Sequence, residues 1–240
     1  MFSNKTYQYG GGDIESGGLF PGISGEDQML RTGFIRKVYG IVAAQLTLTA
    51  LVAISMMSIR PLQEAVQGSM VVVIGSMVAS FALLIPLYCY RQRHPLNLGL
   101  LAGWTLALSV SVGLACCQYP VAAVAEALVL TAGIVAGLTA YTFHATREGK
   151  DFTPWGPALF ASLWGLVLFG FIQMVFPMGP LGQTVYSLIG ALVFSLYIVF
   201  DTFLIVARFS IDEYVWASVN LYLDIINLFL RILEILGRRD

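Results

Sequence analysis

The sequence predicts an all-α integral membrane protein with seven transmembrane helices. Three observations support this fold class: the composition suits lipid, the apolar residues gather in seven long segments, and polar residues in the last segment recur at helical spacing. Hydrophobic residues make up 58% of the 240 residues and charged residues 11%, and the mean hydropathy is +0.79. A soluble domain carries roughly 45–50% apolar and about 25% charged residues, so a chain embedded in lipid is expected.

The seven apolar segments each contain 21 to 25 residues and are joined by short connections. They cover residues 34–58, 69–90, 96–116, 119–143, 153–175, 183–207 and 214–236. A helix of about 20 residues crosses the hydrocarbon of a bilayer, and only helices or closed barrels satisfy their own backbone there. The segments are too long and continuous for barrel strands. We therefore expect a single domain of seven helices, with consecutive helices antiparallel.

The segment before the first apolar stretch has a different composition. Residues 1–33 are rich in glycine and contain few large apolar residues. Such a segment cannot bury enough apolar surface to fold by itself. We expect a disordered tail over residues 1–33 and the seven-helix domain over residues 34–240.

Lysine and arginine indicate the orientation, because cytosolic connections carry the excess of both. Eight lie on the side of the N-terminal tail: Arg31, Arg36, Lys37, Arg91, Arg93, Arg147, Lys150 and Arg208. Three lie on the other side: Arg60, Arg238 and Arg239. We expect a cytosolic N-terminus and a C-terminus across the membrane. The last two arginines leave open a six-span alternative, in which the final segment is re-entrant and both ends are cytosolic.

Two aspartates in the last two apolar segments are the most informative residues. Asp201 and Asp224 interrupt apolar sequence, and their midpoint lies in the connecting loop, between Asp212 and Glu213. An antiparallel hairpin that turns there places both carboxyls at nearly the same depth. Charged groups within a membrane usually face the bundle interior or a wet cavity and mark a functional site. We therefore expect Asp201 and Asp224 to form a pair.

A polar stripe on the last segment supports this pairing. Its residues recur at spacings of four, three, four and three: Asn220, Asp224, Asn227, Arg231 and Glu234. This spacing follows one face of a helix. Because a polar stripe cannot face lipid, we expect a central helix surrounded by other helices or water. The structural alternative is that these groups only hydrogen-bond between helices.

The expected chemistry of the pair follows from its surroundings. Two carboxyls in one poorly solvated site cannot easily both ionise, and they titrate as a unit. Such a pair is suited to a pH-sensitive lock, or to transient contact with a hard cation such as Ca²⁺. No cysteine or histidine spacing predicts another metal site, no cofactor is indicated, and a net charge of −1 gives no surface for nucleic acid.

One acid in the fourth segment is a further candidate. Glu126 shares a helix face with Leu130, Gly133 and Gly137. The two glycines form a pair that permits close helix approach. We therefore expect Glu126 to point into the bundle, either as an acid that lines a pathway or as a buried structural acid.

The end of the second segment carries two basic residues on the cytosolic side. Arg91 is long enough to span part of the distance to Asp201, which lies six residues from the cytosolic end of its own segment. Membrane anchoring alone also accounts for Arg91 and its neighbour Arg93.

The last two segments resemble the Bax inhibitor family, also called the transmembrane BAX inhibitor motif proteins. The resemblance lies in VFSLYIVFD at 193–201, IDEY at 211–214 and LYLDIINLFL at 221–230. The stretch at 125–143, AEALVLTAGIVAGLTAYTF, is similar to the family's fourth helix. FPGISG at 20–25 and FIRKVYG at 34–40 resemble the Lifeguard branch.

The resemblance implies a fold, an activity and a set of site residues. It implies seven helices around a central seventh, a pH-sensitive Ca²⁺ leak, and suppression of stress-induced cell death. The family's di-aspartyl pH sensor falls on Asp201 and Asp224. By position, the arginine that pairs with the first aspartate in the closed state is Arg91, with Arg93 as a substitute, and Glu126 matches an acidic position. The implied location is an internal membrane, with the endoplasmic reticulum as the family default and the Golgi, vacuolar and plasma membranes used by Lifeguard relatives.

Other functions are open on the sequence alone. The runner-up is a non-conducting regulator that binds cell-death proteins or other membrane proteins. An intramembrane aspartyl protease also has two aspartates on neighbouring helices, but the Gly-x-Gly-Asp motif is absent before Asp224, and we expect no enzyme. A seven-helix receptor is disfavoured because the loops are too short for a ligand domain. The expected partners are the bilayer, Ca²⁺ and cell-death regulators.

Overall fold

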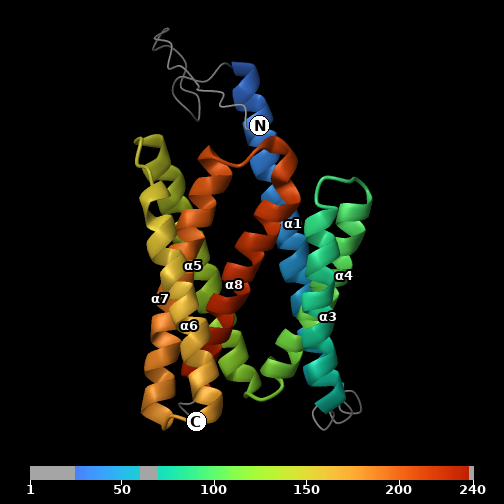
Figure 1. Ribbon diagram of the computed structural model, residues 1–240, viewed down its shortest axis with the longest axis vertical. Helices are drawn as coiled ribbons and strands as arrows, with labels where there is room; N and C mark the ends of the chain where they lie inside the picture. The colour runs from blue at the N-terminus through green and yellow to red at the C-terminus, as the bar shows by residue number, and fades with distance from the viewer. Residues whose placement is uncertain (1–24, 60–69, 238–240) are drawn as a thin grey trace.

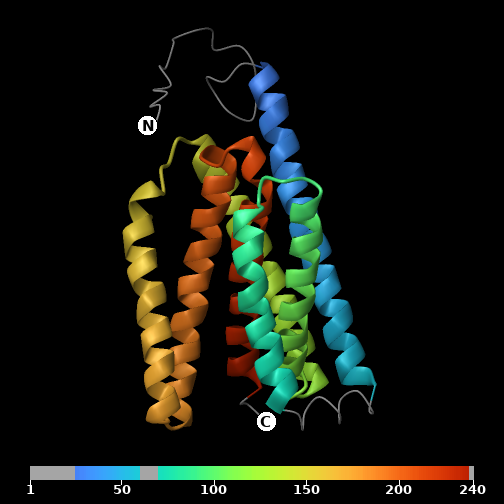
Figure 2. The same cartoon turned by 45° about the vertical axis from the view of Figure 1, so that its right-hand side comes forward.

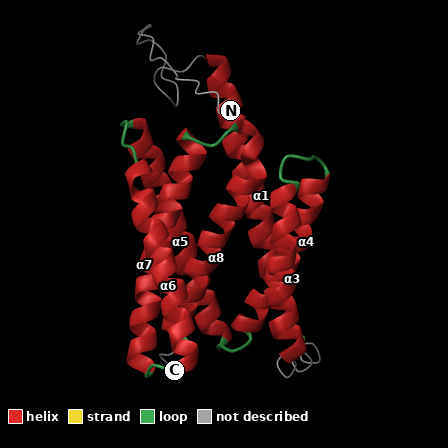
Figure 3. Cartoon of the chain, in the orientation of Figure 1, coloured by secondary structure: helices red, strands yellow, loops and turns green. Residues whose placement is uncertain are grey.

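The computed structural model describes residues 25–59 and 70–237, and these residues form one bundle of helices (Figure 1). Within them the structure contains helices and loops without strands (Figure 3). The elements are α1 (Gly25–Ser58), α3 (Met70–Cys89), α4 (Leu96–Cys116), α5 (Val121–Arg147), η1 (Thr153–Trp155), α6 (Gly156–Val175), α7 (Pro180–Ala207), η2 (Ile211–Glu213) and α8 (Tyr214–Leu236). The seven long helices match the seven apolar segments.

Helix α8 lies at the centre of the bundle, as its polar stripe predicts. It packs against α1, α4, α5 and α7, and it runs through the middle of the molecule in both ribbon views (Figures 1 and 2). Val215, Leu221, Leu228 and Leu233 on this helix have no exposed surface. The helix is therefore enclosed by its neighbours along its length.

The turn between α7 and α8 fixes how the two helices align. Ser210 and Glu213 form a capping box at η2, in which the Ser210 backbone N–H donates to Glu213 Oε2 at 3.1 Å. Reciprocal bonds of this kind define the start of a helix. The chain therefore reverses at the midpoint between Asp201 and Asp224, as the sequence predicts.

Helix α1 begins earlier than the sequence predicts. Residues 25–33, expected to belong to the disordered tail, form the first turns of α1. Arg31 holds this end in place, because its Nε donates to Val206 O at 2.8 Å and its Nη1 donates to Phe209 O. The rest of the predicted tail, residues 1–24, lies outside the described residues, as do Arg60, Arg238 and Arg239.

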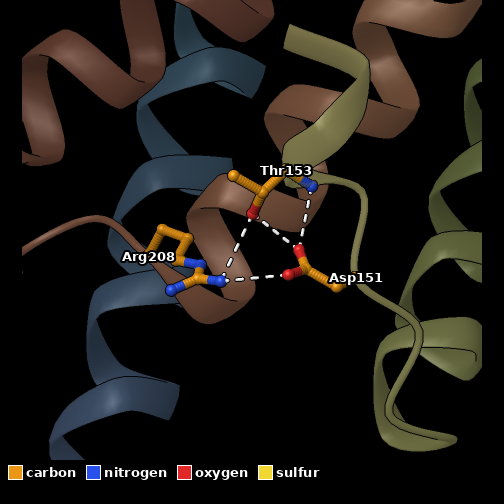
Figure 4. A network of polar contacts seen from close by, with 3 residues as sticks. All are labelled: Asp151, Thr153 and Arg208. Atoms are coloured by element: carbon orange, nitrogen blue, oxygen red, sulfur yellow. Dashed lines mark hydrogen bonds and ion pairs between the residues drawn. The ribbon is translucent and has the colours of Figure 1, made fainter.

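A polar network ties the start of α6 to the end of α7 (Figure 4). Asp151 accepts hydrogen bonds from the Thr153 backbone N–H at 2.8 Å and from Thr153 Oγ1 at 2.6 Å, and Arg208 Nη2 lies 3.3 Å from Asp151 Oδ2. These contacts, the Thr153 bonds foremost, hold the pKa of Asp151 below its ordinary value. Gly149 adopts φ +82° between α5 and this network, a conformation that favours glycine.

A buried hydrogen-bond ladder joins α1, α4 and α8. Gln45 Nε2 donates to Thr105 Oγ1 at 3.0 Å. One helical turn further on, Thr49 Oγ1 lies 2.9 Å from Ser109 Oγ and 2.7 Å from Tyr222 Oη. Because an unpaired polar group inside a membrane bundle is costly, this ladder sets the register among the three helices.

Five helices in the described residues, α1 and α4 to α7, are long and apolar enough to cross a membrane. Helix α3 has a shorter apolar stretch, Ile74–Cys89, and α8 carries the polar stripe. The chain is thus a helical membrane protein, whereas seven crossings stay a prediction. Helix α8 is continuous over 23 residues and ends at the opposite end of the bundle from the start of α1 (Figure 1). The six-span alternative also stays open.

Candidate functional site: an acid pair in a cavity of the bundle

A cavity of about 540 Å³ lies between α6, α7 and α8. Pockets that hold small ligands measure roughly 300–1,000 Å³. Four of the five predicted stripe residues line this cavity: Asn220, Asp224, Asn227 and Arg231. The fifth, Glu234, accepts a hydrogen bond from Arg231 Nη1 at 3.0 Å. The polar stripe of α8 therefore faces a cavity and not lipid.

Asp201 and Asp224 meet at the inner wall of the cavity. Their side chains are 6% and 7% exposed, and the two carboxyls are close enough to hydrogen-bond to each other. Asp224 Oδ2 is buried and receives no hydrogen bond from a donor in the described residues. A bond between two carboxyls requires a proton on one of them. The pair therefore suits a shared proton or a cation held between the two groups.

The surroundings of the pair supply few further oxygen ligands. Asn227 Nδ2 donates to Leu223 O at 2.8 Å, which leaves the Asn227 side-chain oxygen for other contacts. No group of three or more His, Cys, Asp or Glu residues gathers within the described part of the chain. Ca²⁺ in proteins takes six to eight oxygen ligands. The arrangement thus fits a cation that passes or binds briefly, with water completing its shell, better than a storage site.

Arg231 makes the cavity electrically asymmetric. It lies seven residues beyond Asp224, about 10 Å along the helix axis. Its guanidinium carbon is 4.6 Å from the centroid of the Tyr186 ring, and Gly190 leaves room for its stem, because a Cβ there would lie 3.0 Å from Arg231 Cδ. Negative charge therefore occupies one part of the cavity and positive charge another.

Glu126 differs from the sequence prediction. Its side chain is exposed, as are Gly133 and Gly137, whereas Ala123 and Ala127 are 4% and 0% exposed and face the bundle. Helix α5 has two faces of small residues, and the alanine face is the one that packs against α7 and α8. The prediction that Glu126 points into the bundle is wrong for this structure.

Arg91 lies away from the acid pair. It does not line the cavity, and its guanidinium carbon is 4.9 Å from the centroid of the Tyr88 ring. Tyr88 in turn packs edge-on against Trp216 of α8. Arg93 stacks over Tyr90 in a similar way. A pairing of Arg91 or Arg93 with Asp201 stays a prediction about another state of the protein.

Fold and site together define a class: a helical membrane protein whose central helix carries a buried acid pair into a cavity of the bundle. Comparison with known proteins gives the family. The chain belongs to the family described as inhibitor of apoptosis-promoting Bax1, which matches residues 31–240. The predicted resemblance to the Bax inhibitor family is thus confirmed.

Three relatives illustrate the similarity. A BI1-like protein of Arabidopsis thaliana is 49% identical over 222 residues, 92% of this chain and 87% of that protein. Protein LIFEGUARD 4 of Arabidopsis thaliana is 41% identical over 232 residues, 93% of this chain and 94% of that protein. The Golgi anti-apoptotic protein of Vaccinia virus (strain Lister) is 41% identical over 207 residues, 86% of each chain.

Proposed function

We propose that the protein is a pH-sensitive Ca²⁺ leak channel of an internal membrane, which modulates Ca²⁺ stores and suppresses stress-induced cell death. The observation that carries this proposal is the burial of Asp201 and Asp224 side by side in a cavity of the bundle. Acids inside a membrane bundle are costly and mark ion or proton pathways.

The gating mechanism follows from the number of protons on the pair. With one shared proton, the two carboxyls bond to each other and hold α7 against α8. When both are ionised, like charges repel in a poorly solvated site, and a divalent cation relieves the repulsion. Side-chain oxygens of Asn220 and Asn227 then serve as further ligands, with Asp201 and Asp224 as the transient Ca²⁺ contact.

The cell-death role is carried over from the family. Relatives bear the names Lifeguard and Golgi anti-apoptotic protein, and the second name also favours a Golgi location. The resemblance of the sequence favours the endoplasmic reticulum, with the N-terminus in the cytosol. The proposal includes neither an enzymatic activity nor a cofactor, and Ca²⁺ enters only as the permeant ion.

A non-conducting regulator of cell-death proteins is the second candidate. One observation favours it: the Arg231 guanidinium lies in the same cavity as the acids, and a fixed positive charge opposes the passage of cations. In that case the acid pair acts as a sensor or a structural contact, and binding to cell-death regulators carries the function.

An assay in cells under endoplasmic reticulum stress distinguishes the leak channel from the non-conducting regulator. The chain, its Asp201→Asn and Asp224→Asn variants and a control Glu126→Gln variant are expressed at equal levels. Luminal Ca²⁺ and survival are then measured. A leak predicts that the chain and the control lower luminal Ca²⁺ and raise survival, and that both Asn variants lose both effects. If the Asn variants still raise survival but leave luminal Ca²⁺ unchanged, the result would favour the regulator over the channel.

A further inference from the structure

The cavity that holds the acid pair also has an apolar wall that opens to the surface. Helix α6 supplies Phe160, Leu163, Leu166 and Val167 to this wall. Phe160 is 62% exposed and Val167 is 40% exposed, so the cavity reaches the outer face of the bundle beside α6. That face is apolar, as expected for a surface in contact with lipid. An amphiphile in the bilayer therefore has lateral access to the cavity.

The cavity is long and runs beside α8. Along α8 the cavity extends from Asn220 to Arg231, eleven residues or about 16 Å. Apolar and aromatic side chains make up most of the lining, and the polar groups form a single line along α8, with the two acids next to each other. This combination is typical of sites for small molecules with a long apolar portion.

The polar groups select the charge of the ligand. The charged and titratable side chains that face the cavity are Asp201, Asp224, Arg231, Tyr186 and Tyr197. Asp224 is 7% exposed, and its Oδ2 lacks a donor in the described residues. Arg231, by contrast, already has the Glu234 carboxylate at 3.0 Å, although its Nε has no acceptor. The acid pair therefore lacks a hydrogen-bond donor more clearly than Arg231 lacks an acceptor, and a cationic donor would suit it.

Aromatic rings also line the cavity. Tyr197 and Phe194 lie with ring centroids 6.4 Å apart, and Phe160 and Phe200 line the wall beside them. Ring faces attract an ammonium group, most strongly where water is scarce. Acid pair and rings together resemble the pockets that recognise amines.

We propose that this cavity binds a long-chain amine from the bilayer. Its ammonium lies between Asp201 and Asp224, in the place of the shared proton, and its hydrocarbon chain lies along Leu163, Val167 and Phe194. The positive charge of Arg231 keeps the ammonium at the acid end. This inference does not depend on ion conduction, because it concerns occupancy of the cavity and not flux through it.

Photolabelling tests the proposal. The full chain in lipid nanodiscs is labelled with a photoreactive analogue of dodecylamine, and the labelled residues are mapped by mass spectrometry. Unlabelled dodecylamine, dodecanol and dodecanoate compete. We expect labels on α6, α7 and α8 around the cavity. The amine should compete roughly tenfold better than the alcohol, since a hydrogen bond to a charged group contributes at least this much.

Three variants sharpen the test. The double variant Asp201→Asn, Asp224→Asn should lose cavity labelling about tenfold. Val167→Trp should also lose cavity labelling, because the larger side chain fills the space proposed for the hydrocarbon chain. Both acids remain in this variant, so it tests the proposal even if the double variant does not fold. The control Glu126→Gln removes an exposed acid outside the cavity and should label like the native chain.

The overturning results are equally specific. Equal competition by dodecanol would show that charge plays no part. Stronger competition by dodecanoate, lost in Arg231→Gln, would assign the cavity to an anionic amphiphile. If labelling is unchanged both in the double variant and in Val167→Trp, the probe only partitions into the lipid and does not occupy the cavity. None of these results bears on Ca²⁺ flux, so the two proposals fail separately.

Discussion

At the scale of the residue, the acid pair is expected to cost stability in exchange for function. In Asp224→Asn the new amide can donate to Asp201 without a shared proton, so the bond between α7 and α8 no longer requires protonation of a buried carboxyl. We expect this variant to be more stable than the native chain at neutral pH by roughly 1–3 kcal/mol. Unfolding midpoints in detergent measure the change, with Glu126→Gln as a control near zero. A clear loss of stability would instead mark the pair as a structural contact.

Asp151 offers a residue-scale test outside the membrane. Because its pKa is depressed, its contacts stabilise the fold above the ordinary aspartate range near pH 4, and this contribution is lost as the pH falls through the depressed value. Thr153→Val removes the hydroxyl donor and keeps the backbone N–H, so the Asp151 pKa should rise toward its ordinary value. Carbon NMR of the Asp151 carboxyl measures the titration. An unchanged pKa in Thr153→Val would assign the shift to the Thr153 backbone N–H and Arg208, and not to the hydroxyl.

Single residues could be predicted where they stand out from their background. Asp201 and Asp224 stand out because acids are rare in apolar helices, and the loop midpoint placed them at one depth. The direction of Glu126 could not be predicted, because α5 has two faces of small residues and spacing alone does not choose between them. The cavity lining from α6 was missed, since Phe160 and Leu163 look like lipid-facing residues in the sequence.

At the scale of the element, the joints between helices differ in strength. Tyr222 joins α8 to α1 through a fully buried bond to Thr49, whereas Tyr186 joins α7 to α6 through a half-buried bond to Leu166 O at 2.9 Å. We expect Tyr222→Phe to cost about 1–2 kcal/mol and Tyr186→Phe to cost less. Thermal unfolding of both variants in detergent measures this. Equal losses of unfolding free energy in the two variants would contradict the view that α8 is held more tightly than α6.

The bounds of the long helices followed closely from the lengths of the apolar segments. The start of α1 did not, because residues 25–33 are polar and their order depends on Arg31 contacts with the end of α7. The ladder of Gln45, Thr49, Thr105 and Ser109 was also missed. The sequence contained a signal for it, because α1 and α4 each carry two of these polar residues four positions apart.

At the scale of the whole molecule, the topology has a direct test. In a background without Cys89, Cys116 and Cys117, single cysteines replace Glu148 and Met178, and sealed vesicles are treated with a membrane-impermeant maleimide. We expect Glu148→Cys to react from the cytosolic side and Met178→Cys from the other side. An epitope tag after the last residue should be protected from the cytosol if the chain crosses seven times. A tag accessible from the cytosol would favour six crossings.

The central claim is that the pair of Asp201 and Asp224 gates a Ca²⁺ leak, and Ca²⁺ flux into liposomes tests it most directly. The purified chain and its Asp201→Asn and Asp224→Asn variants are compared from about pH 6 to 8, a range in which a coupled carboxyl pair can titrate. The account predicts flux that depends on pH in the native chain and a dependence that is lost or shifted in both variants. Absence of flux above empty liposomes, from protein shown to be folded, would contradict it.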